Sequence, residues 1–382
     1  MALLSGHAQQ YIDSHMDELI SLTANLCAIP APSHHEEARA AFCRDWLLNH
    51  GCAGAYIDSA KNVVWPWQCD GKSKVVCLAA HTDTVFPDTE PFSMEIRDGR
   101  AYCPAVGDDT MSVAQLMLIM AYVAEHKIAC PTGMLFVLNA CEEGLGNLDG
   151  AKQLFADWEG RIGAFVTLDG SYQSIVAKAV GSVRYRISID TEGGHSYGAF
   201  GNRNAIEKMA RLIGLLYDIE IPKIPGVKTT YNVGSISGGT SVNTIAQHAE
   251  MLYEYRSDAR EGLSAMKRKF SEAVERIRPF CGNLTVEVLG ERPCSGNVPL
   301  GELKSLIDRA ADIIERHTGK RPPVKSGSTD CNLPLSLGVP AICFGGYLGG
   351  GAHTREEYVD LSTLTVGFPI VMEFILSYFS DN

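Results

Sequence analysis

The chain has 382 residues, 46% of them hydrophobic and 20% charged, so it is long enough for two folded domains and lacks the composition of a disordered arm. Its 45 acidic residues outnumber its 33 basic residues, which gives a formal net charge of −12, and no basic cluster interrupts this acidic background. The charge disfavours nucleic acid and anionic membrane as partners.

Two helices are predicted at the start of the chain. Residues 11–28 have helical spacing and stop before Pro30. A second helix is expected to begin at Ser33, where Glu36 three residues later would complete a capping box. Gly51 is the expected end of that helix, because glycine readily adopts the left-handed conformation that closes many helices.

Three short apolar runs then predict strands at residues 74–80, 133–140 and 164–168. A helix is expected at residues 110–124, between the first two strands. Nearly continuous apolar strands are typical of a mainly parallel sheet whose two faces are both covered by helices.

The pattern changes between about Gly181 and Pro293. Strand, helix, strand, strand, helix and strand patterns follow one another, at residues 183–190, 204–217, 229–235, 249–255, 262–277 and 284–289. This order predicts a four-stranded antiparallel sheet with two helices on one face, as in ferredoxin-like domains. The first pattern then returns, with a helix at 303–317, a strand at 339–344 and a helix at 368–379. We therefore predict an α/β domain made of residues 1–179 and 293–382, which carries an inserted α+β domain at residues 180–292.

The twelve cysteines and the apolar runs bear on where the protein resides. No C-x-x-C motif occurs, and several cysteines lie inside apolar runs, which favours reduced thiols in a core. The longest apolar run, residues 113–124, is too short to span a bilayer, and the first residues do not resemble an export signal. We expect a cytoplasmic protein.

Residue types that bind metals follow four of the apolar runs. They are His81 and Asp83, the pair Glu142 and Glu143, Asp169, and His353 after a run of glycines. Asp108 and Asp109 lie at the expected start of a helix. Because ligands of an open α/β sheet bind at the carboxyl ends of its strands, these separate segments are expected to converge in one crevice.

Taken singly, most of these residues have an ordinary structural explanation. His81 and Asp83 fit a strand end beside a turn, Asp108 fits a helix N-cap, and His353 fits a flexible turn. Two adjacent carboxylates at a buried edge are harder to dismiss, because they repel each other unless cations or protons compensate. Together, two histidines and at least three carboxylates form the mixed donor set that zinc, manganese or cobalt accepts.

A mechanism follows for such a centre. A carboxylate shared by two metal ions about 3.5 to 4 Å apart would hold a bridging hydroxide. One glutamate of the adjacent pair would take the proton of this hydroxide as it attacks a carbonyl, while the other glutamate binds a metal.

The order H-x-D, D-D, E-E-G, D-G and a late H-T-x-x-E resembles a known family of co-catalytic zinc hydrolases. This is the family of peptidase T, glutamate carboxypeptidase, acetylornithine deacetylase and succinyl-diaminopimelate desuccinylase. The segments that carry the resemblance run through nearly the whole chain: HTDTVF, AVGDDT, NACEEGLGN, TLDG, GGHSYGAFGNRNAI, GGTSVNTIAQHAEMLYEYRSD, GSTDCNLP and GAHTREEYV.

The resemblance implies a zinc-exopeptidase-like catalytic domain with two divalent metal ions, zinc or alternatively manganese or cobalt. One metal would be held by His81, Asp108 and Asp169, and the other by Asp108, Glu143 and His353. Asp83 would orient His81, and Glu142 would be the general base. The implied reaction is hydrolysis of an amide or peptide bond in a small peptide or N-acyl amino acid.

The resemblance also implies roles for the insertion, as a lid and as the contact between the subunits of a homodimer. His195 would stabilise the developing oxyanion, often in the partner subunit, while Asn243 and Arg256 would grip polar groups of the substrate. Without the resemblance these residues fit a turn histidine, a loop asparagine and a surface arginine. Thr110 departs from the family, in which a lysine is common, whereas an aspartate at position 169 favours the peptidase T-like members.

Two other functions are open. A non-catalytic member of the fold would bind an amino acid or a peptide without cleaving it, although every expected ligand and Glu142 are present. A cysteine hydrolase would use one of the twelve thiols, none of which lies in a recognisable nucleophile context. Nucleotide cofactors are not indicated, because no phosphate-binding glycine motif occurs.

Overall fold

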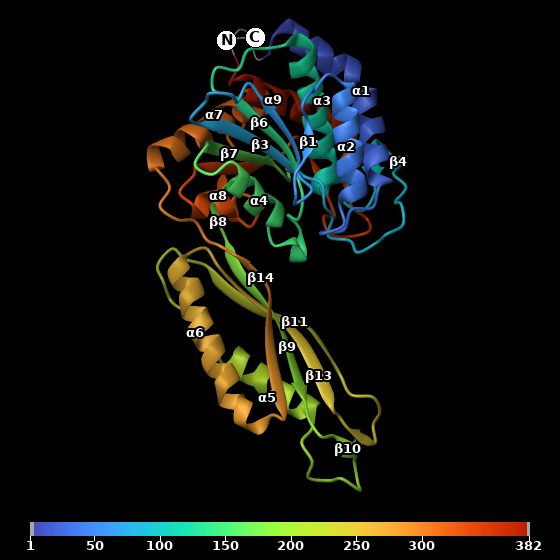
Figure 1. The fold of residues 1–382 in the computed structure, drawn as a ribbon, viewed down its shortest axis with the longest axis vertical. Coiled ribbons are helices and arrows are strands. Elements are labelled where there is room, and N and C mark those ends of the chain that lie inside the picture. Colours follow the sequence, from blue (N-terminus) through green and yellow to red (C-terminus); the bar gives the residue numbers. More distant parts are fainter. Residues whose placement is uncertain (1–3, 380–382) are drawn as a thin grey trace. The chain divides into compact units, whose positions relative to one another are not determined.

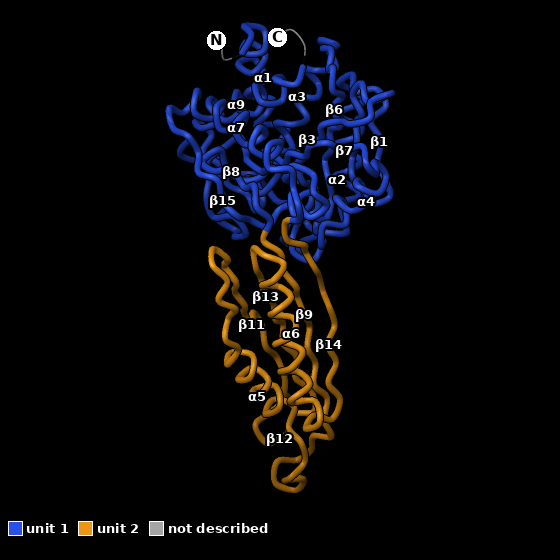
Figure 2. The backbone as a smooth tube through the Cα atoms, turned by 90° about the vertical axis from the view of Figure 1, so that its left-hand side faces the viewer, with its two compact units in different colours: residues 1–179, 296–382 blue, residues 180–295 orange. Residues whose placement is uncertain are grey.

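The structure, a computed structural model, describes residues 4–379. The chain forms two compact units, which Figure 2 distinguishes by colour: unit 1 comprises Met1–Ala179 and Gly296–Asn382, and unit 2 comprises Val180–Ser295.

Unit 1 is built on an eight-stranded sheet with the strand order β1-β2-β6-β3-β7-β16-β8-β15. In that order the strands are Tyr56–Ile57, Val63–Trp67, Met134–Asn139, Val75–His81, Ile162–Leu168, Ala341–Phe344, Ile175–Ala179 and Val324–Gly327. The four central strands β6, β3, β7 and β16 are parallel, while β2 joins β6 and β8 joins β16 in the antiparallel direction. This sheet confirms the predicted mixed, mainly parallel α/β fold.

Helices cover both faces of this sheet (Figure 1). Among residues 4–379, unit 1 has six longer helices: α1 Gly6–Cys27, α2 Glu37–Asn49, α3 Ser112–His126, α4 Asp149–Asp157, α7 Leu300–Thr318 and α9 Leu364–Leu376. Alternate side chains of β3 serve the two faces: Leu78 packs with α3 and α9, whereas Cys77 packs with α4 and the short helix α8 Asn332–Ser336. The sheet is therefore buried on both sides, as its continuous apolar strands predict.

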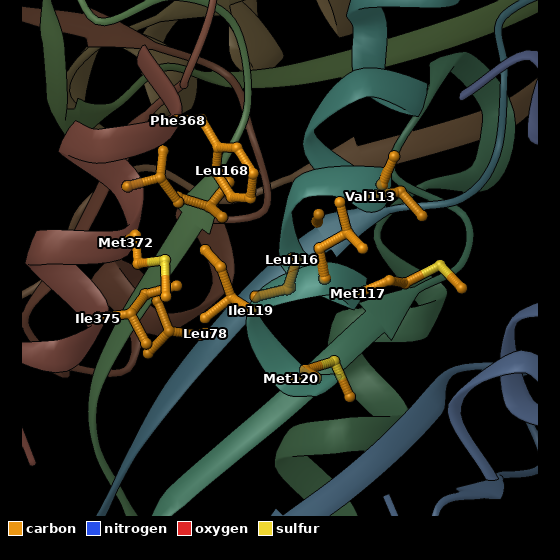
Figure 3. Close-up of a cluster of buried hydrophobic side chains, with 14 of the residues drawn as sticks. Leu78, Val113, Leu116, Met117, Ile119, Met120, Leu168, Phe368, Met372 and Ile375 are labelled. Carbon is orange, nitrogen blue, oxygen red and sulfur yellow. The ribbon is translucent and has the colours of Figure 1, made fainter. Parts of the chain in front are cut away.

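Figure 3 shows part of the first of these two cores, where α3 and α9 meet the sheet. Leu116 and Ile119 of α3 lie near Leu168 of β7 and Met372 of α9, and all four side chains are fully buried. This packing fixes α3, which begins at Ser112, three residues after Asp109.

We expect Leu116→Ala to lower the free energy of unfolding by about 2 to 5 kcal/mol, because it leaves a cavity in a fully buried site. Chemical denaturation monitored by circular dichroism measures this loss. Leu337→Ala is the matched control, since Leu337 is 59% exposed and its truncation should change stability by less than about 0.5 kcal/mol. Equal losses for both variants would contradict this account of the core.

Unit 2 is a four-stranded antiparallel sheet with the order β11-β13-β9-β14 and two helices. Its elements in chain order are β9 Gly181–Asp190, α5 Ala205–Tyr217, β11 Thr229–Gly238, β13 His248–Ser257, α6 Arg260–Ile277 and β14 Asn283–Arg292. The helices pack on one face of the sheet, in a core that includes Met209, Phe270 and Tyr253. This is the ferredoxin-like arrangement predicted from the βαββαβ order.

The prediction for the start of the second helix was wrong. Helix α2 begins at Glu37, and its N-cap residue Glu36 makes no side-chain cap. The Ser33 hydroxyl instead donates to Asp83 Oδ2 at 2.6 Å, and Glu36 Oε1 accepts from the backbone N–H groups of His34 and Cys141. The side chains of Ser33 and Glu36 therefore bind Asp83 and Cys141, and they do not cap the helix.

Two further features follow from the pattern of burial. All twelve cysteines lie in the described part of the chain, where each is buried and unpaired. Among residues 4–379, no helix is both long enough and apolar enough to cross a membrane.

Candidate metal centre

The carboxyl ends of three neighbouring parallel strands carry the residues singled out in the sequence. His81 is the last residue of β3, and Asp169 follows β7, which pairs with β3. Glu142 and Glu143 come soon after β6, on the other side of β3. Parallel strands present their carboxyl ends at one sheet edge, so these groups are placed together.

Possible ligand atoms from this edge form two clusters. One contains His81, Asp108 and Asp169, the other contains Asp108, Glu143 and His353, and within each cluster the atoms lie within 4.8 Å of one another. Asp108 belongs to both clusters. Its Oδ1 lies 3.0 Å from His81 Nε2 and its Oδ2 lies 3.0 Å from His353 Nε2.

The second cluster is more open than the first. His353 Nε2 lies 3.2 Å from Glu143 Oε1, and the His353 side chain is 53% exposed. His81, by contrast, is 1% exposed. The centre therefore has a buried half around His81 and a half at His353 that a small molecule can reach.

The charges of the centre strongly influence one another. Burial, and then repulsion by Asp108, raise the pKa of Asp169 to about 7. The nearby carboxylates of Asp108 and Glu143, with oxygens 3.0 and 3.2 Å from His353 Nε2, raise the pKa of His353 to about 10. Burial alone would raise the pKa of Asp108, but His353 and His81 hold it well below its usual range. Carboxylates this close together repel each other unless cations or protons compensate their charge.

These residues fit a pair of divalent cations. They supply imidazole nitrogens and carboxylate oxygens, the donors that zinc and related metals accept. Glu143 Oε1 is buried without a well-oriented hydrogen-bond donor among residues 4–379, as expected of an oxygen whose partner is a cation.

Asp83 fixes the geometry next to the centre. Its Oδ1 accepts from the backbone N–H of Glu142 at 2.9 Å and its Oδ2 from that of Glu143 at 2.8 Å. His81 Nδ1 lies 3.1 Å from the Asp83 carbonyl oxygen and 3.5 Å from Asp83 Oδ1, which leaves Nε2 facing Asp108. Burial alone would raise the pKa of Asp83, but its contacts with His81 and Ser33 lower it. Asp83 thus contacts both His81 and the turn that carries the paired glutamates.

The adjacent glutamates differ in their surroundings. Glu143 belongs to the second cluster, whereas Glu142 belongs to neither cluster found among the described residues. Both residues are buried, with exposed fractions of 6% for Glu142 and 4% for Glu143.

Three of the predicted site residues belong to unit 2. His195 lies in β10 Gly194–His195, which pairs with β12 Thr244–Ile245, and the Asn243 carbonyl oxygen accepts from Ser196 N at 2.9 Å. His195 Nδ1 accepts from two backbone N–H groups, so a neutral His195 ring carries its proton on Nε2.

Arg256 lies in β13, at the end of the four-stranded sheet of unit 2 that is farther from β10. It is paired with Ser182, near the start of β9, whereas β10 follows the end of β9. Its guanidinium is bound by Glu254, with Nε 2.8 Å from Oε1 and Nη2 3.1 Å from Oε2.

Several residues that position this centre escaped the sequence analysis. The buried Arg39 donates from Nη1 to the Thr82 carbonyl oxygen at 2.9 Å, and so fastens the backbone between His81 and Asp83. Glu357 accepts three backbone N–H groups around Asp108. Glu357 closes the H-T-x-x-E segment, but the pattern alone assigns it no partner.

Comparisons with known proteins agree with this centre. The model of Peptidase family M20/M25/M40 matches residues 77–377. A putative succinyl-diaminopimelate desuccinylase, DapE, of Mycobacterium tuberculosis is 26% identical over 369 residues, which are 93% of this chain and 97% of that protein.

Two solved structures share the fold. The aminopeptidase PepT of Bacillus cereus superposes with a TM-score of 0.71 at 21% identity, covering 95% of this chain and 98% of that one. The YXEP protein of Bacillus subtilis, described as a dinuclear metal binding peptidase from M20 family, superposes with a TM-score of 0.64 at 16% identity, covering 96% of this chain and 98% of that one. The family match covers most of the sequence and includes all five residues of the two clusters, so the chain is a hydrolase that belongs to Peptidase family M20/M25/M40.

Proposed function

We propose that this protein hydrolyses an amide or peptide bond in a small peptide or an N-acyl amino acid, at a centre that holds two divalent metal ions. The observation that carries the proposal is Asp108, whose two carboxylate oxygens face ligand atoms of two different clusters. In this proposal His81, Asp108 and Asp169 bind one ion, and Asp108, Glu143 and His353 bind the other. Zinc is the expected metal, with manganese or cobalt as alternatives.

Two such ions would polarise the substrate carbonyl and make water acidic enough to attack it. Glu142 is the proposed general base, because it adjoins Glu143 in a buried turn without belonging to either cluster. It accepts a proton from the attacking water and delivers it to the leaving nitrogen. Asp83 keeps this turn and the His81 ring in place through the contacts described above.

The inserted segment, residues 180–292, is proposed to act as lid and dimerisation domain. His195 donates from Nε2 to the developing oxyanion, since its Nδ1 already accepts backbone N–H groups. Asn243 and Arg256 bind polar groups of the substrate, and Arg256 is suited to a carboxylate.

The separation of His195 and Arg256 supports a homodimer. Along β9, the partner of Arg256 and the strand end before β10 are eight residues apart, Ser182 to Asp190, which corresponds to about 25 Å. One small substrate cannot reach both side chains of a single chain. Two chains would let His195 of one act with Arg256 of the other. The large side chains of Tyr197 and Val242, in residues that are 90% and 102% exposed, are available for such a contact.

A mixing experiment tests this arrangement. Glu142→Gln and His195→Ala should each be inactive alone, but mixed dimers formed after gentle dissociation and reassociation should recover about a quarter of the unaltered activity. Half of the dimers would be mixed, and each would contain one complete site. No recovery, with mixing verified by differently tagged chains, would contradict action of His195 across subunits.

The proposed activity is tested by metal analysis together with a substrate panel. We expect the purified protein to contain a transition metal, to lose activity in a chelator, and to recover activity with zinc, manganese or cobalt. Dipeptides, tripeptides, and N-acetyl and N-succinyl amino acids distinguish peptidase from deacylase activity. A metal-loaded protein that cleaves none of them would contradict the proposal.

A non-catalytic binding role is not favoured, because the candidate base and both clusters are present in a family of hydrolases. The free, buried state of all twelve cysteines supports a cytoplasmic location, which remains part of the proposal.

A further inference from the structure

We propose that Glu357 is a positioning residue of the metal centre, which holds Asp108 in place by gripping the backbone of residues 105–108. This inference rests on the proposed metal centre and deepens it. Glu357 belongs to neither ligand cluster, so the role concerns the loop that carries the shared ligand.

The grip consists of three hydrogen bonds to one carboxylate. Glu357 Oε1 accepts from the backbone N–H groups of Gly107 and Asp108, each at 2.8 Å. Its Oε2 accepts from the backbone N–H of Ala105 at 3.1 Å. The Glu357 residue is only 2% exposed, so water does not compete for these bonds. Burial raises the pKa of Glu357 to about 7, and the three N–H groups oppose this shift because they stabilise the ionised carboxylate.

The N–H groups of Ala105, Gly107 and Asp108 need an acceptor from outside the loop, because the irregular backbone of the loop does not bring its own carbonyl groups to them. Asp108 has φ −100° and ψ 87°, and Asp109 is also outside the helical region. The regular helix α3 begins only at Ser112. A buried N–H group without a partner destabilises the fold. The carboxylate of Glu357 therefore supplies the acceptors that backbone carbonyl groups supply inside a helix.

A small sheet fixes Glu357 itself. Strand β18 Tyr358–Asp360 pairs with β5 Arg100–Tyr102 in the antiparallel direction, with Tyr358 opposite Tyr102. The Cys103 backbone N–H continues this ladder by donating to the Glu357 carbonyl oxygen at 3.1 Å. The backbone of Glu357 is therefore anchored at the start of the loop that its side chain holds.

Gly107 permits the close approach of the two segments. A Cβ atom at this position would lie 2.8 Å from the Tyr347 hydroxyl oxygen and 3.0 Å from Glu357 Oε1. Tyr347 is itself buried, so it has little room to retreat. Any side chain here would push the loop away from the carboxylate that holds it.

The arrangement links the two halves of the centre. Glu357 follows His353 by four residues, so one short segment both supplies a proposed ligand and holds the backbone of the shared one. Residues that orient metal ligands in this way typically change metal affinity or activity by about 10- to 100-fold when they are replaced.

The test compares Glu357→Gln with Glu356→Gln, an adjacent exposed residue whose replacement removes the same charge. Co²⁺ is titrated into the metal-free protein by calorimetry and by visible absorption. For Glu357→Gln we expect Co²⁺ affinity to fall by about 10- to 100-fold and the Co²⁺ absorption bands to shift. The amide can keep only one acceptor oxygen and turns N–H donors toward a backbone N–H. Glu356→Gln should match the unaltered protein in both measurements.

Glu357→Asp separates position from charge. It keeps the negative charge but shortens the reach by one methylene, so a positioning role predicts weaker Co²⁺ binding for this variant as well. Unaltered affinity in Glu357→Asp would show that charge alone matters and would overturn the proposal. Gly107→Ala pushes the same loop away from the Glu357 carboxylate and should produce a similar spectral shift.

The outcomes separate this inference from the proposed function. If the unaltered protein binds Co²⁺ and Glu357→Gln binds it with the same affinity and spectrum, Glu357 is not a positioning residue, even if the melting temperature of the variant falls. If the unaltered protein binds no Co²⁺, the proposed metal centre itself fails.

Discussion

Replacing Glu142 by glutamine is expected to lower kcat by about 10²- to 10⁴-fold, because the amide cannot accept the proton of the attacking water. Glutamine has nearly the same shape, and the backbone N–H of residue 142 can still donate to Asp83. Metal content should therefore stay unchanged, as should KM in so far as it reports substrate binding. Steady-state kinetics and elemental analysis of the same preparation measure both effects.

Glu159→Gln is the matched control for this replacement, since Glu159 is exposed and belongs to the same unit. It should retain full activity. A Glu142→Gln protein that keeps its turnover would exclude Glu142 as the base. A variant that loses its metals together with its activity would instead assign Glu142 to metal binding.

Replacing Asp108 by alanine should abolish binding of both metal ions, whereas His353→Ala and Asp169→Ala should each remove one. The difference arises because Asp108 belongs to both clusters, while His353 and Asp169 belong to one each. Activity should fall to background in Asp108→Ala, and the stabilisation that added metal confers on the unaltered protein should vanish with it. Calorimetric titration gives the stoichiometry, and thermal unfolding with and without metal gives the stabilisation.

The metal-free melting temperature is the control for this series. It shows whether Asp108→Ala still folds, because without metal this replacement relieves the repulsion of Asp169 but also removes the ion pairs of Asp108 with His81 and His353. Equal losses of metal in all three variants would contradict the shared role of Asp108. Retention of two ions by Asp108→Ala would contradict the proposed centre as a whole.

The fold class followed from patterns that are local in sequence. The run around Leu78 shows strand character because consecutive residues of β3 are buried on alternate faces. Four strands of the eight-stranded sheet escaped prediction: β1, β2, β8 and β15. They lie toward the edges of the sheet, where three of the four residues of β15 are exposed and β2 contains Pro66, a residue that argues against a central strand.

The candidate ligands also followed from local signals, since each stands at the end of an apolar strand or in a recognisable segment. The residues that hold these ligands in place could not be predicted from local signals. Ser33 and Glu36 match a capping box, and only the contacts with Asp83 and Cys141 show what they do. Glu357 lies about 250 positions away from the loop that it holds, a distance over which no periodicity carries information.

The interrupted course of unit 1 has a consequence for synthesis of the protein. Strand β16 lies in the sheet between β7 and β8, although it follows them in sequence by more than 160 residues, and His353 comes later still. The nascent chain therefore cannot complete this sheet, or bring His353 to the candidate metal centre, until residues 341–353 have left the ribosome. Unit 2 is continuous and has its own core, so it can fold while unit 1 is still incomplete.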